Sequence, residues 1–369
     1  MTGDGLTTAI GAISGTSMDG IDVALIRSDG DMRVAPGPGA TYPYPADVAA
    51  ELRAVVADPE RAAGPLAELE AVVTDAHVAA IERFIADHAV DRGAVAVAGM
   101  HGQTVLHRPD AGFTRQLCDG ARAAGALKID VVNDFRAADV AAGGEGAPLA
   151  PLYHAAMCAT LDKPTMVLNL GGVGNVTYLG DDGEIVAFDT GPANALIDDF
   201  VMRRLGWSRD EDGRLAAVGL ADARVVAALM DNPYFHRRPP KSLDRNHFHA
   251  AATRAVEGLA DADGAATLLE FTIEATAVAL QHLAKPPALW LVCGGGRHNP
   301  RIMAGLRRVL PAPVAPVEAV GWDGDALEAQ AFSFLAVRSL MGLPLSWPGT
   351  TGVAGPQCGG RLFRPPASV

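Results

Sequence analysis

One pattern occurs twice in the sequence: two short apolar stretches joined by a turn that contains glycine. In the first copy, residues 9–13 and 21–26 flank a polar turn. In the second copy, residues 165–170 and 176–179 flank a turn of residues 171–175. Short runs rich in Val, Ile and Leu between turn residues are typical of buried strands. Because one copy lies near the start of each half, the pattern predicts an α/β protein of two related domains.

The chain length supports this division, because 369 residues exceed what one ordinary core accommodates. Between the halves lies a glycine-rich segment, residues 141–148, which as a plain linker would supply only flexibility. We place the crossover there. This gives an N-terminal domain of residues 1–140 and a C-terminal domain of residues 141–369, with the end of the chain as a segment that could pack back on the first domain.

The first turn has the composition of a phosphate-binding loop. An Asp-Gly pair alone is typical of an ordinary hairpin, but this turn is longer and more polar than a hairpin needs. Its glycines let backbone N–H groups approach a phosphate, and the hydroxyls of Thr16 and Ser17 can donate to it. The carboxylate of Asp19 or Asp22 can hold Mg²⁺.

Polar clusters follow other predicted strands. His101, Gln103 and Thr104 come after apolar residues 94–98, and an Asn-Asp-Phe-Arg run comes after residues 131–132. Open α/β sheets bind ligands outside the carboxyl ends of their strands. A lone histidine is more often structural, so both interpretations of His101 stay open.

The second half offers two candidates of the same kind. Asp189 follows the predicted strand 185–188 and precedes a helix, where it could act as a helix cap or as a general base on a rigid element. The intervening Gly191-Pro192 puts it off the usual cap position. Three glycines, residues 294–296, lie between a predicted strand and a helix and can approach an anionic ligand, although this signal alone is weak.

Asp325 and Glu328 open a predicted amphipathic helix, residues 329–340. First-turn acids also suit the helix dipole without any function. Three further segments are predicted to lack regular structure: a proline-rich surface loop at residues 35–45, a basic loop with solvated histidines at residues 233–249, and a tail at residues 359–369.

Composition excludes several classes of function. The net charge of −13 argues against nucleic acid as a partner. The four cysteines are widely spaced, which predicts neither a zinc site nor a disulfide framework. No apolar run approaches the roughly 20 residues that span a bilayer, and no signal peptide is visible. We therefore expect a cytoplasmic protein without a membrane partner.

Nine motifs occur in a fixed order: GTSMDGID, GMHGQT, NDFR, GAPL, LNLGGVGN, FDTGP, PPKS, CGGGRHNP and GDALEAQAF. Together they resemble the anhydro-N-acetylmuramic acid kinases of the actin–sugar kinase–Hsp70 superfamily, over nearly the whole chain. The resemblance implies an α/β fold of two ribonuclease-H-like (actin-like ATPase) domains around a deep cleft. It also implies ATP, Mg²⁺, an amino-sugar substrate and a homodimer. The family opens the 1,6-anhydro bond of anhydro-N-acetylmuramic acid with water and phosphorylates the freed 6-hydroxyl. The product, N-acetylmuramate 6-phosphate, enters peptidoglycan recycling.

The resemblance also assigns roles to residues. It makes Asp189 the catalytic aspartate and places Glu328 beside the sugar as its partner. The remaining assignments are a first phosphate loop of Gly15, Thr16, Ser17, Met18, Asp19, Gly20, Ile21 and Asp22, a second phosphate loop with Gly171, Gly172 and Asn175, an adenosine site of Gly294, Gly295, Gly296 and Asn299, and sugar-site residues His101, Gln103, Asp134 and Arg136. Departures from the family pattern at Cys118, Glu145, Ala193 and residues 242–246 leave the fine sugar contacts open.

Two other functions remain as alternatives. A conventional sugar kinase of the same superfamily would phosphorylate a free hydroxyl without opening a bridge. A nucleotide-dependent switch protein would use the same phosphate loops without a sugar pocket. The GMHGQT cluster and Asp189 favour an enzyme over a switch, and ATP consumption with a panel of sugars would separate the two kinases.

Overall fold

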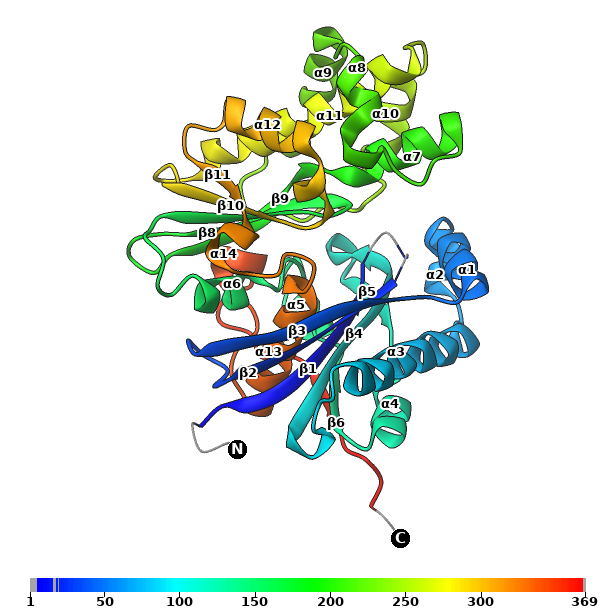
Figure 1. Ribbon diagram of the computed structural model, residues 1–369, viewed down its shortest axis with the longest axis vertical. Helices are drawn as coiled ribbons and strands as arrows, with labels where there is room; N and C mark the ends of the chain where they lie inside the picture. The colour runs from blue at the N-terminus through cyan, green and yellow to red at the C-terminus, as the bar shows by residue number, and fades with distance from the viewer. Residues whose placement is uncertain (1–4, 16–17, 19, 368–369) are drawn as a thin grey trace. The chain divides into compact units, whose positions relative to one another are not determined.

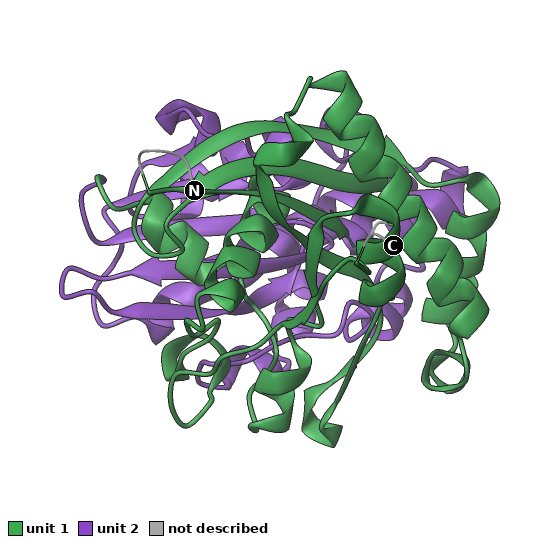
Figure 2. Ribbon diagram, turned by 90° about the horizontal axis from the view of Figure 1, so that it is seen from below, with its two compact units in different colours: residues 1–160, 325–369 green, residues 161–324 purple. Residues whose placement is uncertain are grey.

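The computed structural model describes residues 5–15, 18 and 20–367, and contacts divide the chain into two compact units (Figures 1 and 2). The first unit comprises residues 1–160 and 325–369, and the second comprises residues 161–324. The predicted boundary after residue 140 therefore falls inside the first unit. The reason is helix α6 (Pro151–Met157), which packs on α13 (Leu327–Leu340) and donates the Tyr153 hydroxyl to Gln330 Oε1 at 2.7 Å.

The first unit contains a mixed sheet. Its strands are β1 (Thr7–Ser14), β2 (Gly20–Ser28), β3 (Val34–Pro43), β4 (Val95–Arg108), β5 (Phe113–Leu117), β6 (Asp130–Asn133) and β12 (Arg361–Phe363). They are arranged in the order β12-β6-β4-β1-β2-β3, and β5 pairs with β4. The β1, β4 and β6 strands run parallel, whereas β2 and β3 are antiparallel additions. The predicted strand pair of the first copy is thus confirmed as β1 and β2.

Helices cover both faces of this sheet. The helices of this unit are α1 (Ala46–Val56), α2 (Pro59–Ala63), α3 (Ala67–Asp87), α4 (Gly120–Leu127), α5 (Ala137–Ala141), α6, α13 and α14 (Pro348–Thr351). Ile10 and Ala12 of β1 join the apolar core with α1, α3 and α4. Gly11, between them, points to the opposite face and meets α13.

Two glycines let α13 approach the sheet closely. Gly11 and Gly99 are paired neighbours on β1 and β4. A Cβ on Gly11 would lie 1.9 Å from Ala329 O, and one on Gly99 would lie 2.2 Å from Phe332 O. Only glycine permits this backbone contact. The helix is buried at every position from residue 329 to 338, so the predicted amphipathic character is wrong.

Two segments predicted as irregular are strands. Residues 34–43 form β3 despite their prolines, because β3 is the edge of the sheet and a proline that lacks an N–H is tolerated there. The predicted tail contains β12, which pairs antiparallel with β6. The chain end therefore packs on the first unit.

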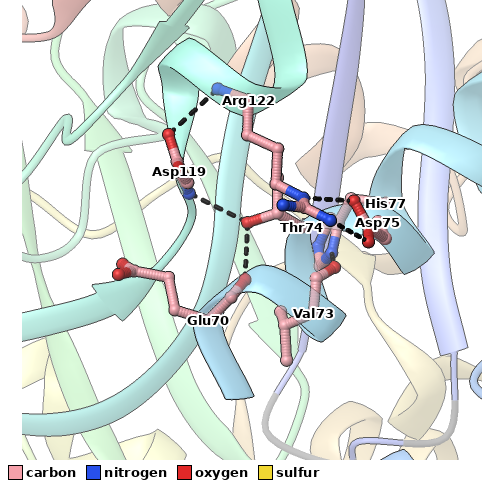
Figure 3. Close-up of polar contacts among 7 residues, drawn as sticks. All are labelled: Glu70, Val73, Thr74, Asp75, His77, Asp119 and Arg122. Carbon is pink, nitrogen blue, oxygen red and sulfur yellow. Dashed lines mark hydrogen bonds and ion pairs between the residues drawn. The ribbon is translucent and has the colours of Figure 1, made fainter. Parts of the chain in front are cut away.

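Hydrogen bonds from α3 and α4 fix the short segment between β5 and α4 (Figure 3). The Thr74 hydroxyl donates to Glu70 O at 2.6 Å and accepts from the Asp119 N–H at 2.9 Å. Asp119 then caps α4 by accepting from the Arg122 N–H at 3.0 Å. The Arg122 guanidinium forms two bonds of 2.6 Å to Asp75.

The second unit repeats the strand order of the first. Its strands are β7 (Thr165–Leu170), β8 (Val173–Leu179), β9 (Ile185–Pro192), β10 (Leu289–Cys293) and β11 (Val314–Pro316). The sheet order β9-β8-β7-β10-β11 matches β3-β2-β1-β4-β6 strand for strand, with three antiparallel strands followed by two parallel ones. The expected fold class, two α/β units of ribonuclease-H-like topology, is confirmed by this repeat. The cleft between the domains stays a prediction.

The second unit has its own core. Its helices are α7 (Asn194–Leu205), α8 (Arg214–Val218), α9 (Ala223–Met230), α10 (His249–Ala255), α11 (Asp261–Val278) and α12 (Pro300–Val309). Trp290 and Phe188 from the sheet pack in one apolar cluster with Phe271 of α11 and Leu306 of α12. Among the described residues, no helix has the length and apolar character needed to cross a membrane.

Candidate functional site

In the first unit, His101 and Arg136 form a direct contact. The sequence predicted that His101 follows the end of a strand. Strand β4 continues through residues 99–108, so His101 lies within the strand. The longer strand is stabilised by pairing with β5. The Arg136 Nε–H donates to His101 Nε2 at 2.9 Å, and Arg136 also donates to Gly146 O at 2.8 Å.

This contact fixes the protonation of His101. Its Nε2 accepts from Arg136, so the proton is on Nδ1, which donates to Gly102 O at 3.0 Å. Burial, and then the charge of Arg136, holds the pKa of His101 well below its usual value. The ring also packs on Phe332 with centroids 4.5 Å apart. His101 is therefore a neutral, rigidly held imidazole at neutral pH.

Gln103 supports the first turn. Its Oε1 accepts from the Ser14 hydroxyl at 2.5 Å, and its Nε2 donates to Gly15 O at 3.4 Å and to Thr104 O at 3.1 Å. The side chain is 1% exposed. These bonds hold the end of β1 where the predicted phosphate loop begins.

The first turn is described in part. Thr16, Ser17 and Asp19 lie outside the described residues. Met18 has a left-handed φ of 54° and donates its N–H to Gly15 O at 3.3 Å. Gly20 and Ile21 begin β2, and Gly20 leaves room for Thr41, which a Cβ would approach to 2.7 Å.

Asp22 is the described carboxylate next to this turn. It lies on β2, and its Oδ1 accepts from the Thr41 hydroxyl at 2.6 Å. Within the part of the chain that the structure describes, no group of three His, Cys, Asp or Glu residues could hold a metal ion. This is compatible with Mg²⁺ bound to a nucleotide, because such an ion uses only one or two protein carboxylates and keeps phosphate and water ligands.

The two remaining predicted residues of this unit are less buried. Asp134 follows β6 with a left-handed φ of 55°. Partial burial raises the pKa of Asp134, while Arg361 and the Ala137 N–H oppose the shift. Glu328 is exposed in the first turn of α13.

Asp139 is a buried residue that the sequence reasoning missed. Its carboxylate, 2% exposed, accepts from the Gly146 N–H at 2.7 Å, from the Thr351 hydroxyl at 2.6 Å and from the Ser346 hydroxyl. It thereby ties the glycine-rich segment beside Arg136 to the C-terminal part of the chain. Nothing in its local pattern distinguishes it from a solvated helical aspartate.

In the second unit, the glycine turn is shorter than predicted. Strand β8 begins at Val173, so the turn is Gly171-Gly172, and Asn175 lies in the strand opposite Asn169. Antiparallel pairing with β7 continues to Gly174, which explains the difference. The start of α7 fixes the turn: Ala193 N–H donates to Gly172 O at 3.1 Å and Asn194 N–H to Gly171 O at 3.0 Å.

The second glycine cluster packs against the same turn. Gly294 has a φ of 72°, and a Cβ there would lie 2.3 Å from Asn169 Oδ1. A Cβ on Gly296 would lie 2.6 Å from Leu170 Cβ, whereas Gly295 has more open surroundings. Asn194 Nδ2 donates to Leu170 O and Gly171 O at 2.9 and 3.1 Å. The two predicted nucleotide segments of this unit are therefore brought together.

Asn299 has a structural task. Its Oδ1 caps α12 by accepting from the N–H groups of Arg301 and Ile302 at 3.0 and 3.3 Å. The helix start and the glycine cluster are thus adjacent in sequence, but the Asn299 oxygen is already engaged.

Asp189 lies inside β9 and opposite Asn175 on β8. The predicted strand end is wrong, because pairing with β8 continues to Pro192. The cap of α7 is Ala193, so Asp189 does not cap a helix. Its Oδ2 accepts from the Leu243 N–H at 2.7 Å, and its own N–H and C=O bond to Lys241 O at 3.0 Å and the Tyr234 hydroxyl at 2.6 Å. The carboxylate is held on a rigid strand with 8% of the residue exposed.

The sequence profile of the anhydro-N-acetylmuramic acid kinase family matches residues 7–365. A protein of Paramagnetospirillum magneticum named anhydro-N-acetylmuramic acid kinase is 51% identical over 357 residues, 97% of this chain and 99% of the relative. A protein of that name from Rhodospirillum rubrum is 51% identical over 368 residues, 99% of this chain and 96% of the relative. A solved structure, (R)-2-hydroxyglutaryl-CoA dehydratase component A of Acidaminococcus fermentans, aligns with a TM-score of 0.47 and 9% identity, and covers 91% of this chain and 99% of its own.

Proposed function

The chain belongs to the anhydro-N-acetylmuramic acid kinase family, and from this premise we propose how its residues carry out the reaction. The reaction uses ATP. Water opens the 1,6-anhydro bond of anhydro-N-acetylmuramic acid, and the freed 6-oxygen takes a phosphoryl group, which yields N-acetylmuramate 6-phosphate for peptidoglycan recycling. The four cysteines, all within the described part of the chain, are thiols and not disulfides, which supports a reducing, cytoplasmic location. A homodimer is the expected assembly.

Asp189 is the general base in this proposal. A carboxylate that is fixed on a strand, with the Leu243 amide at Oδ2, can accept a hydrogen bond from a water and take its proton. It takes one proton as the water oxygen bonds to C1. The C1–O6 bond breaks as this new bond forms, and O6 keeps the electron pair and attacks the γ-phosphorus of ATP, from which ADP departs. Phosphorus takes the place of a proton on the leaving oxygen, so no separate general acid is needed.

The glycine turns bind the nucleotide phosphates in this proposal. Backbone N–H groups of the first loop, Gly15 to Asp22, and of the second loop at Gly171-Gly172 donate to them. The N–H groups at the start of α7 donate to the carbonyl oxygens of Gly171 and Gly172. These bonds hold the backbone of the second turn in one conformation, which supports a role in binding phosphate. Gly294–Gly296 approach the adenosine. Asp22 and Asp19 would hold Mg²⁺, which neutralises phosphate charge when bound.

The sugar side is formed by His101, Arg136 and Asp134, with Glu328 to orient the water or a hydroxyl. The exposed carboxylate of Glu328 supports this assignment, as does the neutral state of His101, which keeps a hydrogen-bonding ring without adding charge. Gln103 acts through the first turn, because its polar atoms already bond to Ser14 and Gly15.

The test is the substitution Asp189→Asn, which keeps the shape of the side chain and removes the base. We expect kcat to fall by roughly 10²–10⁴-fold while ATP still binds, as measured by a coupled ADP assay and by calorimetry. Asp231→Asn, at an exposed position after α9, is the matched control and should leave kcat unchanged. Near-normal turnover by Asp189→Asn would contradict the mechanism.

An isotope experiment tests independently whether water attacks carbon or phosphorus. Reaction in ¹⁸O-water should place the label on C1 of the product sugar, because water attacks carbon and O6 attacks phosphorus. Mass spectrometry of the product and its phosphate locates the label. Label in the transferred phosphate would instead indicate that water attacks phosphorus.

A further inference from the structure

A lysine is buried next to β9, the strand that contains Asp189. Lys241, from the PPKS motif, is 2% exposed. Its Nζ donates to Tyr234 O at 3.0 Å and lies 3.4 Å from His282 Nε2. The same ammonium lies over the ring of Tyr234, 4.5 Å from the centroid, and 5.7 Å from the centroid of Phe188.

Burying an ammonium has an energetic cost that apolar packing alone would avoid. Burial, and then the charge of Arg237, lowers the pKa of Lys241 to about 8, while Asp189 opposes the shift. The charged and titratable groups that face the ammonium are thus Asp189 on β9, Tyr234 and Arg237 earlier in the same loop, and His282 after α11. At neutral pH the lysine is mostly charged in a site that does not favour charge.

The contacts of Lys241 lead directly to the reacting carboxylate. Its backbone oxygen accepts from the Asp189 N–H, and two residues later the Leu243 N–H donates to Asp189 Oδ2 at 2.7 Å. Tyr234, whose backbone oxygen holds the ammonium, donates its hydroxyl to Asp189 O at 2.6 Å. The ammonium, Tyr234 and residues 241–243 therefore form one bonded unit around Asp189.

We propose that Lys241 is a positioning residue, whose buried ammonium anchors residues 241–243 to Tyr234 and so fixes the orientation of the Asp189 carboxylate. The proposal rests on the role of Asp189 given above. Without the anchor, the Leu243 amide moves relative to Oδ2, and the Asp189 carboxylate samples orientations in which it no longer faces the water. Misplacement by about 1 Å can cost roughly 10²-fold in rate.

The experiment compares Lys241→Met with the parent protein and with Lys285→Met. The methionine keeps an unbranched chain and removes the ammonium. Lys285 is the matched control, because it is an exposed lysine of the same unit that pairs with Asp181. We expect Lys241→Met to lower kcat roughly 10- to 100-fold, with KM for ATP unchanged and with cooperative urea unfolding retained. Lys285→Met should change none of these.

A double variant separates positioning from general damage. In an Asp189→Asn background, Lys241→Met should cause no further loss of kcat, because residues that act as a unit are not additive. An additional loss of similar size in that background would overturn the proposal. Lys241→Gln, which keeps a donor without the charge, should lose less kcat than Lys241→Met.

The outcomes also distinguish this inference from the proposed function. If Asp189→Asn retains near-normal kcat, the general-base assignment is wrong. If Asp189→Asn is inactive but folded Lys241→Met has normal kcat, only the positioning inference fails. Failure of both Lys241 variants to fold would assign Lys241 to stability alone and would likewise overturn the proposal.

Discussion

Asp139 illustrates how a single buried charge is compensated. A carboxylate removed from water is costly unless donors surround it. Here one backbone N–H and two hydroxyls point at its two oxygens. The three donors come from the glycine-rich segment and from residues 346 and 351. The Asp139 side chain therefore joins two distant parts of the chain beside Arg136, which contacts His101.

We predict that Asp139→Leu destabilises the protein. The substitution leaves the Gly146 N–H and the hydroxyls of Ser346 and Thr351 without their acceptor in a buried site. The free energy of unfolding should fall by about 3 kcal/mol, measured by urea denaturation. Asp47→Asn, at an exposed position on α1, should change it by less than about 0.5 kcal/mol. Equal stability of Asp139→Leu and the parent would contradict this account.

Helix α3 contains a buried titratable group. His77 is 0% exposed, and its Nδ1 bonds to Val73 O at 2.9 Å (Figure 3). Its Nε2 has no hydrogen-bond partner among the residues that the structure describes. Burial lowers the pKa of His77 from 6.5 to about 4. The folded state therefore favours the neutral imidazole of His77.

The pH dependence follows from the direction of this shift. Below pH 6.5 His77 binds a proton in the unfolded chain but not in the folded chain. The free energy of unfolding therefore falls as the pH drops towards 4, and the contribution of His77 is complete above pH 6.5. The shift corresponds to about 3 kcal/mol. We predict that His77→Phe reduces the loss of stability between pH 6.5 and 4, measured by thermal unfolding at a series of pH values. His88→Gln, at the exposed end of α3, should keep the parent's acid sensitivity; an unaltered acid profile for His77→Phe would count against the assignment.

At the scale of the whole molecule, the first unit is discontinuous and the second is continuous. Helix α13 belongs to the first unit, although 164 residues of the second unit precede it in the chain. It fills the sheet face opposite α3, where Gly11 and Gly99 admit its backbone. Without α13, that face would be exposed to water, which removes a large part of the apolar burial that drives folding.

We predict that residues 161–324 fold alone and that residues 1–160 do not. The fragment 161–324 retains the complete sheet and core of the second unit. The fragment 1–160 lacks α13 and β12 of the first unit. Circular dichroism and thermal unfolding of each fragment would show a cooperative transition only for residues 161–324. Joining residues 1–160 to 325–369 through a flexible linker should restore cooperativity. A cooperative transition in residues 1–160 alone would disprove this dependence on α13.

Local patterns in the sequence determined much of the scaffold. The two strand–turn–strand copies, the family and the repeated α/β architecture follow from short-range features, because strand periodicity and glycine turns are set by neighbouring residues. The motifs also indicated the glycine segments around residues 171 and 294, which the second unit brings together. The roles of Asp189, Glu328 and the phosphate loops remain predictions.

Tertiary contacts decided the rest. The prolines of residues 34–43 form a strand because the sheet ends there, and β4 continues past His101 because β5 pairs with it. Lys241 in a basic loop and Asp139 on a short helix have ordinary local sequences, yet both are buried. Burial and hydrogen-bond partners come from residues far apart in the chain. A local pattern cannot specify them, because only the packed sheet and helices determine which side chains lose contact with water.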